Sequence, residues 1–141
     1  MSELPKPQKR GPKPKRYLRK QRKTSLSAAK RKLWPLFAAY IKNRDGPTCF
    51  SCGATGLKGR SWHAGHLVSR RIGATLYAEN NVFSQCGHCN VFLRGNWHAF
   101  AQQYVERFGE AALMTLLDQA RQIKRWTVPE LEALIDHYER A

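Results

Sequence analysis

Two Cys-x-x-Cys pairs constrain this chain more than any other feature of its sequence. Cys49-Phe-Ser-Cys52 and Cys86-Gly-His-Cys89 are separated by 33 residues. Two thiolates spaced by two residues can reach one tetrahedral ion, and two such pairs complete a shell of four sulfurs that leaves no position for water or substrate. We therefore expect Cys49, Cys52, Cys86 and Cys89 to bind a structural Zn²⁺ ion, which supplies folding free energy to a segment with little core of its own.

Two alternatives to this zinc site are a pair of disulfides and a mixed metal shell that uses His88. The sequence has no apolar run long enough to cross a bilayer, and its basic start is not followed by an apolar signal-peptide core. We expect the chain to stay in the cytoplasm where it is made, which is the bacterial host if a phage encodes it. Thiols stay reduced there, so paired cysteines favour a metal over disulfides.

The charge of the chain predicts a polyanionic partner. Of its 141 residues, 25 are Lys or Arg and 10 are Asp or Glu, which gives a formal net charge of +15. Residues 1–24, rich in Pro, Lys, Arg and Gly, predict a disordered arm that binds DNA phosphates by releasing counterions, with Lys13, Lys15 and Arg16 among its contacts. The alternative interpretation of this segment is a solvated tail with no partner.

Residues 25–141 are expected to form one domain of the α+β class. Apolar spacing predicts a helix over 25–44, in which Pro35 either kinks the helix or begins a second one. Helices are also predicted from Asn96, as an N-cap, to Gly109, from Glu110 to about Ile123, and from Thr127, whose Glu130 completes a capping box.

The segment between the helices, residues 48–95, is rich in Cys, His, Gly and Asn and should carry the chemistry. Strand-like pieces at 61–67 and 82–84 flank a loop over 69–75, which predicts a two-stranded ribbon followed by a helix that begins near Cys89. In that arrangement His66 ends the first strand and Asn90 opens the helix, so the two side chains can face one phosphate. A neutral imidazole can take a proton from water, and an amide oxygen can bind Mg²⁺.

This order of residues resembles that of the HNH, or His-Me finger, nucleases. The resemblance implies a small ββα-metal core in which His66 is the general base, Asn81 is the central Asn that fixes the loop, and Asn90 is a ligand of the catalytic ion. Many members have an Asp or His ligand directly before the base, where this chain has Gly65. Either Asn90 holds the ion mainly through waters, or His63 supplies a second ligand.

From about residue 33 onward the chain also resembles the NinG/Rap recombination proteins of lambda-like phages. The matching stretches are 38–45, 49–53, 63–66, 81–90 and 93–96. The resemblance implies an endonuclease, dependent on Mg²⁺ or Mn²⁺, that nicks branched recombination intermediates such as Holliday junctions and D-loops. Because two symmetric nicks resolve a four-way junction, a homodimer is expected, with the C-terminal helices or the helix before Cys49 as the interface.

Further contacts with DNA are expected from Arg70 and Arg71 in the loop between the strands and from Arg94. Trp62 and Trp97 flank the predicted site and can stack on an unpaired nucleotide, although tryptophans more often pack in a core or at its rim. Two other functions are open: a nicking nuclease without preference for DNA structure, and a zinc-dependent DNA-binding protein without catalysis.

Overall fold

The fold is known from a computed structural model that describes residues 24–141. Almost all of the predicted basic arm, including Lys13, Lys15 and Arg16, lies outside the described residues. Within the described part of the chain, no helix combines the length and apolar character that crossing a membrane requires.

Helix α1 (Leu26–Asp45) is one continuous element. The Ser25 hydroxyl caps its start by accepting a hydrogen bond from the backbone N–H of Ala28, at 3.2 Å. Pro35 lies inside the helix on its exposed side, so the prediction that a second helix begins there is wrong. Gly46, with φ of +76°, ends the helix, and its N–H donates to the carbonyl of Lys42.

The predicted ribbon is present as two antiparallel strands, β1 (Trp62–His66) and β2 (Val82–Cys86). Opposite pairs run from Trp62 with Cys86 to His66 with Val82. Because side chains alternate along a strand, Ala64 and His66 share the face toward α1, whereas His63 and Gly65 share the opposite face. This register fixes which residues can meet on each side of the ribbon.

The chain leaves β2 through η4 (His88–Phe92), a single turn of π-helix, and continues into α2 (Trp97–Phe108) and α3 (Glu110–Ala120). The helix expected near Cys89 is therefore this short turn. Helix α3 ends earlier than predicted, and Ile123 lies in the connection that follows it, 94% exposed. The last helix, α4 (Val128–Arg140), begins with the predicted capping box of Thr127 and Glu130.

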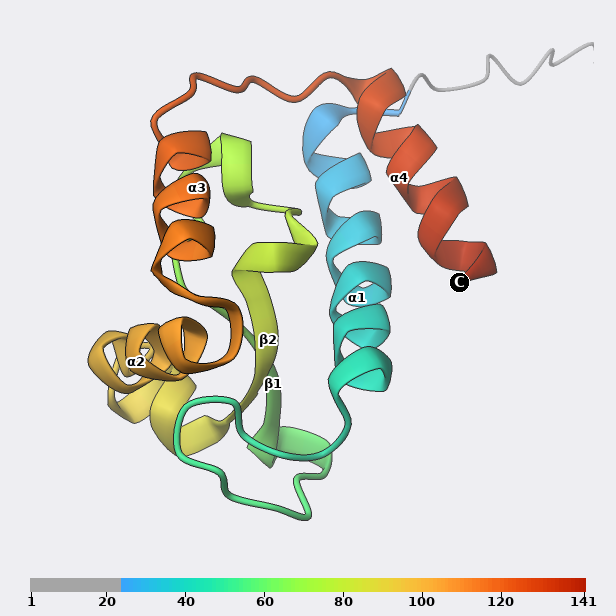
Figure 1. Cartoon of the computed structure of the whole chain (residues 1–141). Coiled ribbons are helices and arrows are strands. Elements are labelled where there is room, and N and C mark those ends of the chain that lie inside the picture. The colour runs from blue at the N-terminus through green and yellow to red at the C-terminus, as the bar shows by residue number, and fades with distance from the viewer. Residues whose placement is uncertain (1–23) are drawn as a thin grey trace, which may run out of the picture.

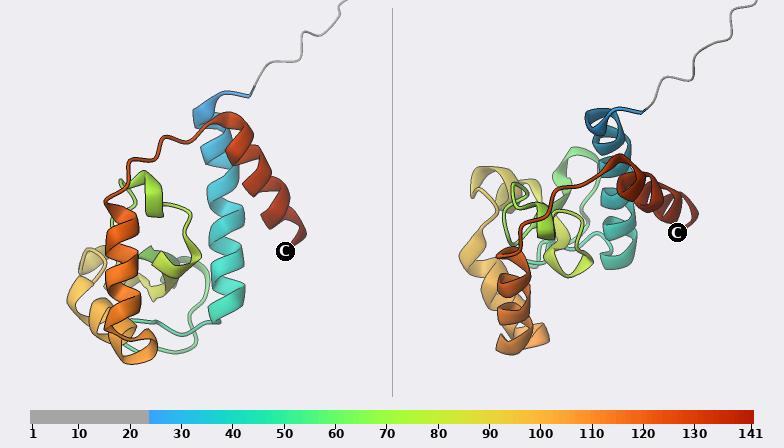
Figure 2. Two further views of the ribbon diagram at one scale, coloured as in Figure 1. Left: turned by 45° about the horizontal axis from the view of Figure 1, so that its top comes forward. Right: turned by 90° about the horizontal axis from the view of Figure 1, so that it is seen from above.

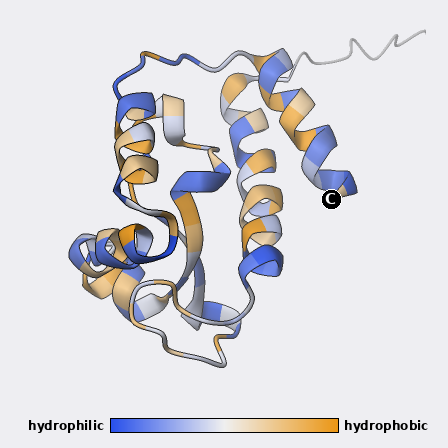
Figure 3. Ribbon diagram, in the orientation of Figure 1, coloured by the Kyte–Doolittle hydropathy of each residue, from blue (hydrophilic) through white to orange (hydrophobic). Residues whose placement is uncertain are grey.

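The ribbon lies between two helical layers, with α1 and α4 on one side and α2 and α3 on the other (Figure 1). Figure 2 shows the same order of elements from two further directions. One core cluster joins α1 and α4 to Ala64 and Val82, and a second joins α2 and α3 to Phe83. All five residues of β2 are buried, in keeping with the apolar colour of its upper part in Figure 3. A two-stranded ribbon is marginal alone, and here both of its faces are covered.

The exposed Pro35 predicts a stabilising substitution. Pro35→Ala restores a backbone N–H donor inside α1 and removes the clash of the proline ring with the preceding turn, while little apolar packing is lost. We expect the free energy of unfolding to rise by about 1–3 kcal/mol. Urea unfolding of the zinc-loaded protein measures the change. The matched control, Ala39→Pro at another exposed position of α1, should destabilise the protein, and an unchanged or lower stability of Pro35→Ala would contradict the prediction.

Candidate functional site

The four cysteines converge on one point between the loop after α1 and the end of β2. Their sulfur atoms all lie within 4.8 Å of one another, and the Sγ atoms of Cys52 and Cys86 are 3.8 Å apart. Four sulfurs at Zn–S distances of about 2.3 Å in a tetrahedron lie about 3.8 Å apart, so the Cys52–Cys86 pair already has that spacing and the other sulfurs are close enough for one ion to gather them. His88 is not part of this cluster, and none of the four cysteines forms a disulfide.

Hydrogen bonds around the sulfurs suit thiolate ligands. Burial alone would raise the pKa of the Cys49 thiol, but backbone N–H groups of Cys86, Cys52 and Ser51 together lower it to about 7. The N–H of Cys89 donates to Cys86 Sγ at 3.3 Å. Burial, with further contributions from neighbouring thiols, raises the pKa of Cys89 to about 12. A bound cation would favour deprotonation of Cys89, because it offsets the cost of burying a negative sulfur.

Asn96 also contacts the cysteine cluster. It occupies the N-cap position of α2 with φ of +45°, but its side chain makes no capping hydrogen bond. Its Nδ2 instead donates to Cys89 Sγ at 3.3 Å. The prediction of an ordinary side-chain cap is therefore wrong, because the left-handed backbone turns the amide back toward the cysteines.

His66 lies at the end of β1, and one of its two ring nitrogens is already hydrogen-bonded within the protein. Its ring stacks on Trp34 of α1, with centroids 5.3 Å apart, and its Nε2 lies 2.9 Å from the backbone carbonyl of Leu76. A carbonyl can only accept, so Nε2 carries the proton and Nδ1 keeps a lone pair. Burial lowers the pKa of His66, and the nearby charge of Arg70 acts in the same direction. The imidazole is therefore neutral at physiological pH.

Asn90 is oriented by His63. The Nε2 of His63 lies 2.8 Å from the carbonyl of Arg60, which can only accept, so the neutral ring has its lone pair on Nδ1. Asn90 Nδ2 donates to that Nδ1 at 3.1 Å. This hydrogen bond fixes the orientation of the Asn90 side-chain amide, with Nδ2 toward His63. Asn90 Oδ1 is then available for a ligand. His63 therefore occupies a positioning role behind Asn90, and the lone pair that would bind an ion directly is already in use.

Gly65 and Gln85 explain why no carboxylate stands before His66. A Cβ atom at position 65 would lie 1.9 Å from Gln85 Oε1 and 3.1 Å from Asn90 Oδ1. Gln85 is fully buried, and its Nε2 donates to Ser51 Oγ at 2.6 Å and to the carbonyl of Gly95 at 2.9 Å. Its side-chain amide therefore fills the space that any side chain at position 65 would need. The Oε1 atom has no conventional hydrogen-bond partner within the described part of the chain.

His66 and Asn90 line the same depression, although His66 belongs to the α1 side of the ribbon and Asn90 packs near its other side. The depression has a volume of about 500 Å³ and is also lined by Ser69, Arg70, Arg94 and Trp97. Four predicted site residues, His66, Asn90, Arg70 and Arg94, are thus brought together. Arg71 is exposed on the neighbouring turn and is not part of the lining.

Asn81 does not reach the depression. It is fully buried, and its Oδ1 accepts from the N–H of Val68 at 2.7 Å. Its Nδ2 donates to the carbonyls of Val68 and Thr75 at 3.0 and 2.9 Å. Asn81 therefore closes the loop between the strands and cannot touch a substrate. These contacts agree with the loop-fixing role that the resemblance implied for Asn81, and they leave it no direct part in catalysis.

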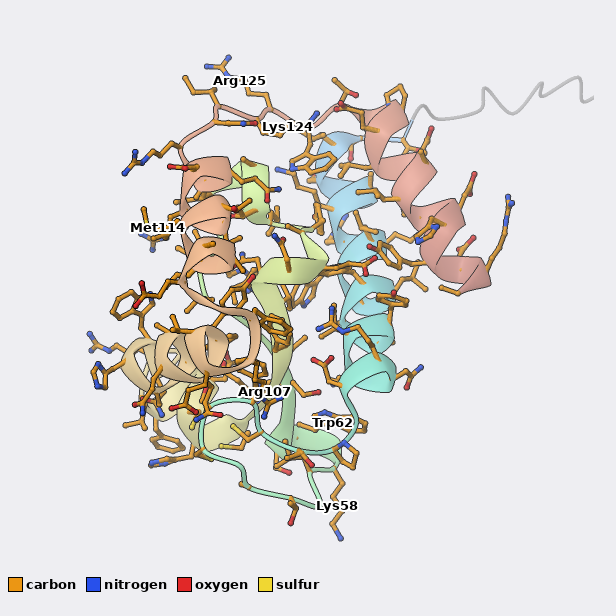
Figure 4. The ribbon with its side chains drawn as sticks, in the orientation of Figure 1. Lys58, Trp62, Arg107, Met114, Lys124 and Arg125 are labelled. Atoms are coloured by element: carbon orange, nitrogen blue, oxygen red, sulfur yellow. The ribbon has the colours of Figure 1, made fainter. Side chains whose placement is uncertain are left out.

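A larger cavity, about 720 Å³, has neither His66 nor Asn90 in its lining, which includes the aromatic side chains of Phe50, Phe83, Tyr104 and Phe108. Arg107, labelled in Figure 4, places its guanidinium 4.5 Å from the ring of Phe50 at the edge of this cavity. Trp62 is also labelled there, beside the C-terminal end of α1, where Lys42 lies 5.6 Å from its ring. The indole N–H of Trp62 donates to Ser84 Oγ at 3.0 Å. This bond holds the Trp62 ring against the ribbon, as expected for a packed residue.

Sequence reasoning missed three parts of this site: Gln85, Trp34 and the carbonyl of Leu76. A glutamine inside an expected strand has no distinctive pattern, and a tryptophan at helical spacing is indistinguishable from a core residue. A backbone carbonyl carries no sequence signal at all. The only available hint was Gly65, because a glycine inside a strand often marks the close approach of another group.

Comparison with known proteins places the sequence near one group of phage proteins. A family model described as Bacteriophage Lambda NinG protein matches residues 3–141. The chain is 30% identical to protein ninG of Escherichia phage lambda over 104 residues, which cover 72% of this chain and 50% of that protein. Protein ninG of Escherichia phage 933W is 31% identical with the same coverage. The chain thus spans about half the length of these curated relatives, and no solved structure matches it.

The cysteine cluster predicts that metal and fold are lost together. We expect one zinc ion per chain, and removal of that ion by a strong chelator should unfold the segment that joins α1, the ribbon and η4. Zinc release followed by a colorimetric indicator, alongside circular dichroism, measures both events. Zn²⁺ should restore the fold whereas Mg²⁺ should not. A metal-free protein with unchanged spectra and unfolding midpoint would refute the structural role.

The contact of Gly65 with Gln85 predicts a strongly coupled pair. Gly65→Ala should displace Gln85, break one buried and one partly buried hydrogen bond, and lower the free energy of unfolding by about 2–4 kcal/mol. Gln85→Ala alone loses the same bonds, so adding Gly65→Ala to it should cost little more. A double-mutant cycle by urea unfolding measures this coupling, and additive effects would contradict the proposed clash.

Proposed function

We propose that this chain, which belongs to the NinG family of lambdoid phage proteins, is a divalent-metal-dependent DNA endonuclease of the HNH type. One observation carries the proposal: a neutral imidazole and an oriented amide oxygen line the same depression, together with two arginines. Phosphodiester hydrolysis needs a proton acceptor for water, a centre that binds the phosphate, and compensation of its charge.

His66 is the proposed general base. The Leu76 carbonyl holds the proton on Nε2 and fixes the ring, while stacking on Trp34 prevents rotation. Nδ1 is then the one ring nitrogen that can take a proton from an attacking water. Burial favours the neutral form of the ring, which is the form that accepts a proton. The water oxygen attacks phosphorus, and the 3′ oxygen of the DNA departs as the P–O bond breaks.

Asn90 is the proposed ligand of the catalytic ion, either Mg²⁺ or Mn²⁺. An amide oxygen suits such hard cations, which keep several waters. When bound, the ion would neutralise charge on the scissile phosphate and stabilise the leaving oxygen. His63 orients Asn90 by accepting its N–H, so Oδ1 is presented without a rotamer change. Gly65 and Gln85 leave no room for a carboxylate at the neighbouring position, so the site depends on Asn90 more than sites that have a second protein ligand.

The charge around the depression suits a DNA backbone. Residues 58–98 contain five Lys or Arg and a single acid, Glu79. That carboxylate accepts hydrogen bonds from the hydroxyls of Tyr40 and Tyr138, so it is engaged in packing α1 and α4. Arg70 and Arg94 line the depression itself and are the proposed phosphate contacts. DNA binding should accordingly weaken steeply with salt.

The proposed substrates are branched recombination intermediates, including Holliday junctions and D-loops, and the proposed active assembly is a homodimer. This part of the proposal is supported by the resemblance of the motifs to NinG/Rap recombination proteins and by the symmetry of a four-way junction. Two alternatives make different predictions. A nuclease without preference for structure cuts junction and linear duplex equally, and a DNA-binding protein without catalysis cuts neither.

His66→Ala tests the nuclease. We expect the rate of cleavage of a four-way junction to fall by about 10²–10⁴-fold, because the proton acceptor is lost, with little change in DNA affinity. Single-turnover assays with Mg²⁺ or Mn²⁺ measure the rate, and fluorescence anisotropy measures binding. His137→Ala is the matched control, since His137 is exposed on α4 and outside the depression.

The same assays include Asn90→Ala, for which cleavage and the dependence on metal concentration should both change. Zinc content and circular dichroism establish that each variant is folded. Equal loss of binding and cleavage in the His66 variant would favour the binding protein. A wild-type protein that cuts linear duplex as fast as a junction would overturn the preference for branched DNA.

A further inference from the structure

The turn between β2 and α2 exposes large apolar side chains next to the candidate site. Val91, Phe92, Leu93 and Trp97 are 58%, 80%, 47% and 58% exposed. Across residues 24–141 the structure has eight exposed large hydrophobic residues, and four of them fall within these seven positions. The other four are scattered over α1, α2, α3 and the connection after α3. We refer to Val91, Phe92, Leu93 and Trp97 as the apolar ridge.

The ridge is held rigidly, which distinguishes it from a loose loop. The N–H of Leu93 donates to the His88 carbonyl and the N–H of Gly95 donates to the Cys89 carbonyl, both at 2.9 Å. The Asn96 amide bonds to Cys89 Sγ, and Gln85 holds the carbonyl of Gly95. The ridge is thus anchored to the cysteine cluster on one side and to the ribbon on the other.

The backbone between the third and fourth residues of the ridge takes positive φ at three consecutive positions. Arg94 and Asn96 both have positive φ, at 51° and 45°, on either side of Gly95 at 97°. Left-handed geometry is unfavourable for residues with a side chain, and such positions persist only where the surroundings determine them. The phenyl ring of Phe92 has the His88 ring stacked beside it, at a centroid distance of 5.9 Å. The largest side chain of the ridge is therefore presented to solvent on a supported turn.

We propose that the apolar ridge is a wedge that packs against the open faces of unstacked base pairs at a DNA branch point. The proposal relies on the proposed function only for the identity of the partner, which is DNA. Trp97 and Arg94 line the same depression as His66 and Asn90, so the ridge is continuous with the proposed cleavage site. Arg70 and Arg94 in the lining of the depression attract phosphates, which is the charge complementarity that selects DNA over an apolar protein segment.

The apolar side chains of the ridge explain why the protein would prefer branched DNA over duplex without reading the base sequence. In continuous duplex every base face is covered by its neighbour, and inserting an apolar side chain requires the stack to be opened. At a branch point the stack is already interrupted, so the ridge gains apolar and stacking contacts without that cost. Every base has an aromatic face, so these contacts do not depend on base identity. Cleavage is then directed close to the branch, because the ridge and the depression share Trp97.

The experiment compares Phe92→Ala and Trp97→Ala with wild type on the full-length, zinc-loaded protein. The DNA probes are an immobile four-way junction with 2-aminopurine at the branch and a linear duplex of the same sequence around the probe. Binding is measured without Mg²⁺ so that no cutting occurs. We expect wild type to raise 2-aminopurine fluorescence on the junction, and each variant to lose this rise. The affinity ratio of junction to duplex should fall about ten-fold or more in each variant.

Two further variants control for nonspecific effects. Ile123→Ala removes the most exposed apolar residue outside the ridge and should behave as wild type. Phe92→Trp keeps an aromatic face and should retain both the fluorescence change and the junction preference. Unchanged fluorescence and preference in Phe92→Ala and Trp97→Ala would overturn the wedge. Conversion of a dimer to a monomer by Phe92→Ala in sedimentation would also overturn it, since the ridge would then be covered by a second copy of this chain.

The wedge and the nuclease fail in distinguishable ways. A wild-type protein that opens the branch but does not cut when Mg²⁺ or Mn²⁺ is added would refute the nuclease and leave the wedge in place. A wild-type protein that cuts junctions, with ridge variants that keep the full preference for them, would refute the wedge alone.

Discussion

The four-cysteine cluster is the constraint on which the rest of this structure depends. It brings together the loop after α1 and the end of β2, two described segments that are held to each other by few backbone hydrogen bonds. A two-stranded ribbon has too little hydrogen bonding and too little core to be stable alone. The four sulfurs meet where β2 ends and where the turn that carries Asn90 and the apolar ridge begins. The geometry of the candidate site therefore follows from the place where the four cysteines converge.

The second constraint is the placement of the ribbon between two helical layers. The α1 side supplies Trp34, which holds the ring of His66, and the loop between the strands supplies the carbonyl of Leu76. The opposite side supplies His63 and Gln85, which hold Asn90 and the backbone before α2. Each of the two proposed catalytic groups thus receives its orientation from a different part of the fold. They meet at one depression because Asn90 packs against Gly65, which directly precedes His66 at the end of β1.

Several polar residues near the site hold the backbone or the cysteines in place and do not themselves face the depression. Asn81 makes three buried hydrogen bonds that close the loop between the strands, and Asn96 donates to a cysteine sulfur in place of capping its helix. Gln85 fills the space beside Gly65 where a carboxylate would otherwise stand. Such amide side chains are well suited to these positions, because they donate and accept at once without adding charge to the interior. The amide side chains of Asn81, Gln85 and Asn96 therefore hold the ribbon and the turn that follows it in place.

The sequence by itself determined the features that depend on short-range geometry: the two Cys-x-x-Cys pairs, the two strands, the capping box of Thr127 and the helical stripes of α1 and α4. It also determined the positive charge, and it brought His66 and Asn90 forward as candidates. Only the tertiary structure decided which nitrogen of His66 is free, why position 65 must be Gly, and that Phe92 lies in solvent instead of a core. The physical reason is that spacing within a few residues is set by the backbone of one element. Hydrogen-bond partners and exposure are set by residues from other parts of the chain, such as Leu76 for His66 and Ser51 for Gln85.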